Sequence, residues 1–394
     1  MNKHRAKAPN TSTHPDDVDD ALTLQLAEQA VALAQQAKGK LGVTPEVERG
    51  FPHLIKKALL GKKDEVLYDA IERARDADLA GSLLLRDAVE EASEVVIIRR
   101  DDGSVHEINA FVIPLFVHSV GGLRLERTFQ DQQAFEELTA SFVKAGLESP
   151  DARVVLVSHA FHVDEIDRIT YSHLNEMTRD AGAALLGKKS APVAALERSM
   201  AGWPQSYFEP ADTALELRFL LGFACKRADD PFYAVPASEA KADAYFAARE
   251  ERFRDWTQQY GPIVQRVLGG GTEIDFLYQD LFHGGKERGI AEYYTLQLMS
   301  ELNLDLQEHA IDAADTSAVI APSDSGGEVV LQVNLYAQDG SLVASSEKPF
   351  GASGSLQAEV EDMRDALSVL GVASFAQALR FDAAGNPVEP RSLA

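Results

Sequence analysis

The amino-acid sequence predicts an α+β protein, with a helical N-terminal region followed by two related units of mainly antiparallel sheet that carry helices on one face. Apolar residues recur at three- and four-residue steps up to residue 93 and then give way to extended runs. The Asp-Gly pairs at 102–103 and 339–340 each separate two such runs, which is the pattern of a β-hairpin. The order hairpin, helix, strand, helix then occurs twice along the chain.

The length of 394 residues favours more than one domain. Composition changes along the chain indicate where the divisions fall. We expect a disordered tail over 1–17, a helical region over 18–93, a first α+β unit over 94–190, a connector over 191–213, and a second α+β unit over 214–394 that includes the C-terminal hairpin and helix.

The N-terminal region is expected to hold amphipathic helices. The first begins near Asp19, carries Leu22, Leu26 and Leu33 on one side, and stops at Gly39. Further helices are expected over 44–60, 64–76 and 79–92. Because apolar stripes of this width would promote association in water, we expect the helices to pack as a small bundle against the first sheet.

The first sheet unit begins where the period becomes extended at residue 94. Pro114 falls inside the long apolar run 108–117, and its missing N–H predicts an edge position or a bulge. The remaining elements expected in this unit are a strand over 123–126, a helix over 131–146, a strand over 153–158 and a helix over 164–186.

The second unit shows the same alternation of patterns. Residues 312–328 are rich in Ala, Ser, Asp and Gly, so we interpret them as a flexible linker or loop. The expected elements are a hairpin of 215–225 with 232–235, helices over 238–267 and 287–302, a strand over 273–278, a hairpin over 328–346 and a helix over 356–370.

An internal match supports the repeated order. A shift of 121 residues aligns 135–162 with 256–283 without a gap, and five positions are identical, among them Phe161 with Phe282 and His162 with His283. The match favours a duplication. Coincidental likeness between two amphipathic helix–strand units is the alternative.

Charge and cysteine content restrict the classes of function. The chain has 38 basic and 62 acidic residues, a net charge of −24, so nucleic-acid and anionic-membrane partners are not expected. Cys225 is the single cysteine, which excludes an intrachain disulfide and suits a reducing cytoplasm. The sequence shows neither a secretory signal nor an apolar run long enough to span a membrane.

One cluster of reactive side chains follows the strand expected over 153–158. Two histidines three residues apart converge on one ion if the backbone turns. A possible metal site, shared between the two units, would comprise His159, His162, Asp164, Asp280 and His283. The alternative is local: Asp164 is a good N-cap, and a histidine at such a turn usually bonds to nearby groups. No phosphate-binding or catalytic motif stands in its proper context, so no cofactor is expected.

Three short segments carry a resemblance to a known family. They are 217–222 (Leu-Arg-Phe-Leu-Leu-Gly), 256–259 (Trp-Thr-Gln-Gln) and 277–283 (Leu-Tyr-Gln-Asp-Leu-Phe-His). With the order of elements, they resemble a proteobacterial family known as domain of unknown function 2863, over about residues 80–300. The resemblance implies no reaction, cofactor or catalytic residue.

These observations favour a non-enzymatic cytoplasmic binding or regulatory protein with a protein or small-molecule partner. The alternatives are an enzyme, most plausibly a metal-assisted hydrolase using the histidine–carboxylate cluster, and a structural or assembly role. A deep pocket with inward His and acidic side chains would favour the enzyme, and a grooved apolar surface would favour the binding protein.

Overall fold

The computed structural model describes residues 15–393 except 40–41, 43, 120–130, 147–148, 150, 188–214, 269–271, 278–280, 326–327, 351–354 and 383–384. The expected connector over 191–213, the strand over 123–126 and most of the expected tail lie outside these residues. Helical structure begins at Pro15, two residues inside the expected tail.

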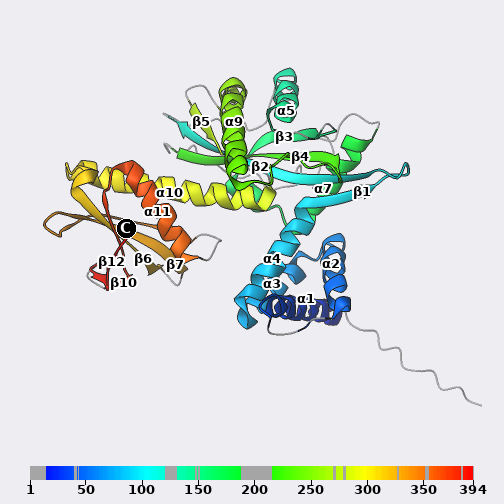
Figure 1. Cartoon of the computed structure of the whole chain (residues 1–394), viewed down its shortest axis with the longest axis horizontal. Coiled ribbons are helices and arrows are strands. Elements are labelled where there is room, and N and C mark those ends of the chain that lie inside the picture. Colours follow the sequence, from blue (N-terminus) through cyan, green and yellow to red (C-terminus); the bar gives the residue numbers. More distant parts are fainter. Residues whose placement is uncertain are drawn as a thin grey trace, which may run out of the picture.

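Four helices form the N-terminal bundle, as the apolar periodicity predicts (Figure 1). They are α1 (Pro15–Ala37), α2 (Pro45–Leu60), α3 (Asp64–Ala77) and α4 (Leu79–Glu94). Their shared core includes Leu26, Ile55, Leu67 and Leu85, with Tyr171 of the next domain packed against it. Helix α4 runs directly into the first strand, so the bundle is joined to the sheet without a linker.

The central sheet is antiparallel and has the order β1-β2-β4-β3, with β5 pairing with β2 beyond the end of β1. Its strands are β1 (Val95–Arg99), β2 (Val105–Ser119), β3 (Arg153–His162), β4 (Leu215–Arg227) and β5 (Thr272–Phe276). The two longest strands, β2 and β4, pair in the middle over thirteen positions, from His106↔Arg227 to His118↔Leu215.

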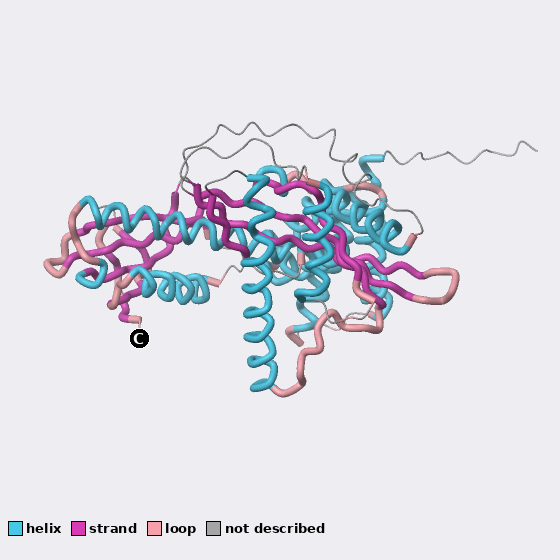
Figure 2. The backbone as a smooth tube through the Cα atoms, turned by 90° about the horizontal axis from the view of Figure 1, so that it is seen from above, coloured by secondary structure: helices cyan, strands magenta, loops and turns pink. Residues whose placement is uncertain are grey.

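Helices cover both faces of this sheet. Side chains of β2 alternate between a core under α5 (Gln132–Gly146) and α9 (Glu239–Leu268) and a core on the opposite face. The opposite core receives α6 (Val163–Ile166), α7 (Tyr171–Leu186) and the first half of α10 (Phe282–Glu308) (Figures 1 and 2). The α+β class is confirmed, but the expectation of helices on one face is corrected.

The strands of the two expected units interleave in one sheet instead of forming two sheets side by side. Strand β3 follows β2 in sequence yet pairs with β4, and β5 follows β4 yet pairs with β2. The helices between them, α5 and α9, lie on the same face. Hydrophobic periodicity identifies strands but does not specify which strands pair, which is why the sequence predicted separate units.

Pro114 lies inside the sheet, and its position has a simple geometric explanation. It pairs with Phe219 of β4, so β2 is not an edge strand there. The carbonyl oxygen of Pro114 accepts the N–H of Leu277 at 3.0 Å. Since the N–H and C=O of one strand residue point the same way, the missing N–H faces the end of β5 and removes no bond to β4.

A second sheet forms the C-terminal domain, in the order β12-β9-β6-β7-β8. The hairpin expected over 328–346 and the helix expected over 356–370 are confirmed. Two other expectations are wrong: 232–235 is a loop, and 312–328 contains a central strand where a linker was expected. The new elements are η1 (Ala313–Asp315), β6 (Thr316–Ser325), β7 (Glu328–Ala337), β8 (Leu342–Pro349), α11 (Leu356–Leu370), β9 (Ser374–Gln377), β10 (Arg380–Phe381), β11 (Pro387–Val388) and β12 (Arg391–Ser392).

Helix α10 belongs to both domains. Phe282 near its start is fully buried under the central sheet, and Leu298, Leu302 and Leu306 enter the C-terminal core with α11. Figure 2 shows the helix passing from one domain to the other. Among the described residues, no helix is both long enough and apolar enough to cross a bilayer.

Close packing of α10 on β2 requires a glycine at position 289. A Cβ atom there would lie 2.8 Å from ring carbons of Pro114 and 3.1 Å from Phe219. Gly289→Ala should therefore lower the free energy of unfolding by up to about 2 kcal/mol, because overpacking costs roughly 1–3 kcal/mol and helix propensity returns about 1. Urea denaturation followed by Trp fluorescence measures this change.

The matched control is Gly284→Ala in the same helix, where no atom lies within 4 Å of the added methyl. That variant should be neutral or slightly more stable. Equal destabilisation by both substitutions would contradict the packing explanation.

Candidate functional site

The histidines at the end of β3 take part in a local helix cap. His162 Nδ1 accepts the N–H of Asp164 at 3.2 Å, and Glu165 Oε2 accepts the N–H of His162 at 2.8 Å. The same Glu165 oxygen lies 3.3 Å from Nε2 of His159. These contacts form a capping box at the start of α6. The local alternative therefore describes His162, but Asp164 is not the N-cap that was expected: it lies in the first turn of α6 and donates its N–H to His162, which holds the N-cap position.

His283 lies in a different environment, in the first turn of α10. It is 7% exposed, its Nε2 lies 3.0 Å from Ser93 Oγ, and burial lowers its pKa to about 3. The Ser93 hydroxyl donates its proton to the Glu90 carbonyl at 2.7 Å. The neutral imidazole is consequently not positioned to activate Ser93 as a nucleophile, since the serine proton points elsewhere.

The expected metal ligands thus divide between two places. His159, His162 and Asp164 lie at the turn between β3 and α6, whereas His283 packs against α4. Asp280 falls outside the described residues. In the part of the chain that the structure describes, no group of three or more His, Cys, Asp or Glu side chains is placed to hold a metal ion.

Two carboxylates of α4, the buried Glu94 and the partly buried Glu90, face the start of α10, and Glu94 bonds to it directly. Glu94 Oε2 accepts the backbone N–H groups of Phe282 and His283 at 3.1 and 3.0 Å and so caps α10. Burial raises the pKa of Glu94 to about 7, outweighing these two hydrogen bonds. Burial, followed by the nearby Glu287, also raises the pKa of Glu90 to about 7. Neither residue stands out in the sequence, because helix periodicity does not distinguish a buried acid from a solvated one.

A groove lies along β5, between α9 and α10. Its volume is about 660 Å³, within the usual range for ligand sites. Helix α9 forms one wall, β5 the floor, and α10 contributes the side chain at position 288. The residues that give the lining its chemical character are three aromatic side chains, Phe246, Phe253 and Phe276, and three arginines, Arg249, Arg254 and Arg288.

The charged groups of the groove differ in their partners. Arg254 pairs with Glu250 at 3.1 Å, and Asp275 lies 3.5 Å from His118. The buried Arg249 guanidinium stacks over the ring of Tyr233, 3.4 Å from its centre. Arg288 is exposed, and its guanidinium makes no ion pair or hydrogen bond with any described residue. A cationic group therefore remains available beside an aromatic surface.

Sequence reasoning missed this groove because its residues are far apart in sequence and ordinary individually. Phe246 and Phe253 are seven residues apart, which places them on one face of α9. Phe253 is buried, but Phe246 is 51% exposed because the first half of α9 extends beyond the sheet (Figure 2). The signal that was available is the arginine density of α9 in an acidic chain.

Comparison with known proteins identifies a family without an assigned activity. A model of the family described as "Protein of unknown function (DUF2863)" matches residues 19–326. The expected resemblance is confirmed and extends beyond residues 80–300, from α1 to the end of β6. No curated protein and no solved structure gives a significant match.

Glu90 should make stability depend on pH. Its pKa is raised from 4.5 to about 7, so the folded state holds this proton more tightly, and that contribution to stability is lost as the pH rises through about 7. Glu90→Gln should match the wild type at pH 4 and exceed it at pH 8 by roughly 1–3 kcal/mol, since one pKa unit is about 1.4 kcal/mol and partial solvation reduces the full shift.

Chemical denaturation at the two pH values measures the difference, and the exposed neighbour Glu91→Gln is the control. His283 titrates in both proteins: its pKa falls from 6.5 to about 3, so its contribution appears as the pH rises through that range. This contribution cancels in the comparison. If the stability of Glu90→Gln differed from that of the wild type by the same amount at pH 4 and at pH 8, the raised pKa of Glu90 would be contradicted.

Proposed function

The chain belongs to the DUF2863 family, and because the description of that family names no activity, we propose a function from the groove. The protein is a non-enzymatic, cytoplasmic binding protein. It holds a ligand with an apolar body and a negative charge between α9, β5 and α10. Such a ligand places its apolar part on the phenylalanines and its charge beside the arginines.

The available guanidinium of Arg288 beside an aromatic surface carries this proposal. The chain has a net charge of −24, yet the described residues that line the groove include three arginines against two acidic residues, Glu250 and Asp275. Glu250 pairs with Arg254 and Asp275 lies 3.5 Å from His118, so neither carboxylate is paired with Arg288, and three arginines against two acids leave the described lining with one positive charge in excess. A local positive potential on an acidic protein selects anions and attracts them from solution.

The composition of the lining favours binding over catalysis. The described residues that line the groove include no histidine, cysteine, serine or lysine. General acid–base or nucleophilic chemistry needs an imidazole, carboxylate, hydroxyl, thiol or amine within hydrogen-bond reach of the reacting atoms. Of these, the described lining offers Thr257 and two carboxylates, and the carboxylates of Glu250 and Asp275 already lie beside Arg254 and His118. The alternative of a metal-assisted hydrolase depends on the histidine–carboxylate cluster, none of whose members lines this groove.

Binding of an aromatic anion tests the proposal. Anilinonaphthalene sulfonate should bind with saturable fluorescence enhancement, and Arg288→Ala and Phe246→Ala should each weaken its affinity by about 3- to 10-fold, because a partly exposed charge or aromatic contact contributes about 1 kcal/mol. Fluorescence titration of the folded protein, checked by its unfolding temperature, measures the affinities.

The control variants are Arg75→Ala on α3 and Val369→Ala on α11, which remove an exposed arginine and an 88% exposed apolar side chain far from the groove in sequence. They should leave the affinity unchanged. If Arg288→Ala and Arg75→Ala bound the probe equally well, the groove would not be the site.

A further inference from the structure

We infer that the natural ligand of the groove is an extended acidic peptide segment of a partner protein, which adds to β5 as another strand of the central sheet. This inference rests on the proposed function and specifies its ligand. It follows from the direction of the β5 backbone groups, from the regular, bulge-free pairing of β5 with β2 and from the placement of charge across the groove.

The hydrogen-bond pattern of β5 shows which backbone groups are open. Leu277 donates its N–H to Pro114, so the backbone groups of Leu277 point toward β2. Because this direction alternates along an antiparallel strand, those of Asp275 also point toward β2, and those of Ile274 and Phe276 point away from it. Both outward residues line the groove. Their N–H and C=O groups form a template for another strand.

An independent contact supports this alternation. Because the direction of the backbone groups repeats every two residues, the carbonyl of Thr272, two residues before Ile274, also points outward. That carbonyl accepts a hydrogen bond from the Gln265 side chain of α9 at 3.1 Å. The outward edge of β5 is therefore closed at Thr272 by the protein's own side chain and lies open at Ile274 and Phe276, where no described residue bonds to it.

Strands β3 and β8, two other sheet edges, carry interruptions that β5 lacks, although β5 is itself short and bears the charged side chains of Glu273 and Asp275. Strand β3 has an irregularity in its pairing between Leu156 and Ala160, and such bulges discourage addition of a strand. Strand β8 ends at Pro349, preceded by Lys348, which points inward to a buried ion pair with Glu359 at 2.7 Å. The pairing of β5 with β2 is regular from Thr272 to Phe276.

The charges across the groove indicate the composition of the added strand. Successive side chains of a strand point to opposite faces of the sheet. On one face, the side chains of the added strand meet Phe253, Ile274 and Phe276, which belong to the core under α9. On the other face α10 packs against the sheet and supplies Arg288. A segment that alternates apolar and acidic residues complements both faces.

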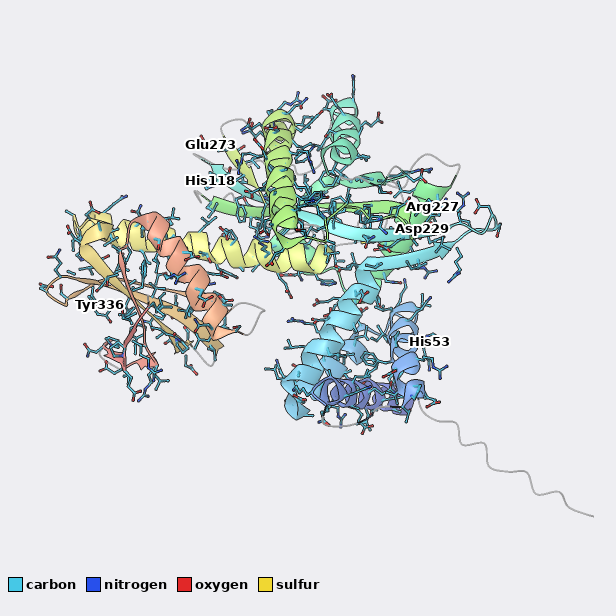
Figure 3. All side chains as sticks on the ribbon, viewed as in Figure 1. His53, His118, Arg227, Asp229, Glu273 and Tyr336 are labelled. Carbon is cyan, nitrogen blue, oxygen red and sulfur yellow. The ribbon has the colours of Figure 1, made fainter. Side chains whose placement is uncertain are left out.

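The acidic side chains of Glu273 and Asp275 limit where the acidic residues of the added strand can lie. They lie on exposed positions of β5, and Glu273 stands opposite His118 in the register of β2 (Figure 3). Asp275 already has His118 within 3.5 Å. Acidic side chains of the peptide therefore gain from a position beside Arg288 and lose from one beside Glu273, which selects the register of the added strand.

The first test uses fluorescein-labelled Ac-Val-Glu-Val-Glu-Val-Glu-NH₂ and two N-methylated forms, one with every valine and one with every glutamate methylated. In an added strand, all residues of one type direct their N–H groups toward β5. One methylated form should lose at least about 10-fold in affinity by fluorescence polarisation, and the other should bind like the parent.

The protein supplies the matching measurement. Ile274→Pro removes one outward N–H without removing a bond to β2, and should weaken peptide binding by about 10-fold, whereas Ile274→Val should not. If the proline variant is unstable, amide exchange in the wild type replaces it. Peptide binding should slow exchange at Ile274 and Phe276 selectively, because the amides of Glu273 and Asp275 are directed toward β2 in the free protein.

The outcomes separate this inference from the proposed function. Equal binding of both methylated forms, or no change in exchange at Ile274 and Phe276, would overturn strand addition. Failure of the parent peptide to bind, with anilinonaphthalene sulfonate still held by an Arg288-dependent site, would overturn the peptide and retain the anion site. Loss of Arg288-dependent binding by both probes would overturn the proposed function itself.

Discussion

Capping of α10 by Glu94 is the interaction on which the arrangement of the molecule depends. One carboxylate oxygen at the end of α4 accepts two backbone N–H groups from the first turn of α10. A helix N-terminus is a favourable place for an acceptor, because its first N–H groups have no partner within the helix. This contact joins the N-terminal bundle to the helix that enters both remaining cores.

The cap also determines what lies on either side of it. On one side, Ser93, Glu90, Tyr171 and His283 form a buried polar junction, with the Tyr171 and His283 rings 5.5 Å apart. About two turns further along the helix, Gly289 packs against Pro114 of β2. Arg288, adjacent to that contact, is thereby directed into the groove. The position of the proposed binding cation follows from how α10 is held, not from local sequence.

The interleaved sheet explains why an edge is open at that place. Strand β2 is long enough to pair with β1 near its start and with β5 near its end. Pro114 lies where β5 ends. Leu277 donates its N–H to the Pro114 carbonyl, but Pro114 has no N–H to donate to the Leu277 carbonyl in return. Strands β3 and β5 pair reciprocally, β3 with β4 and β5 with β2, but the matched residues Phe161 and Phe282 lie in a strand and in a helix, and the matched histidines reach different surroundings.

Sequence alone determined the elements whose formation depends on local pattern. The N-terminal helices, the hairpin around Asp102-Gly103 and the helix over 356–370 follow from periodicity, turn residues and capping, all of which act within a few residues. Tertiary structure decided strand pairing, the central place of β6, and the grouping of Phe246, Ile274 and Arg288 in one groove. These depend on contacts between distant segments, and a repeat of two or 3.6 residues specifies a buried face without specifying what buries it.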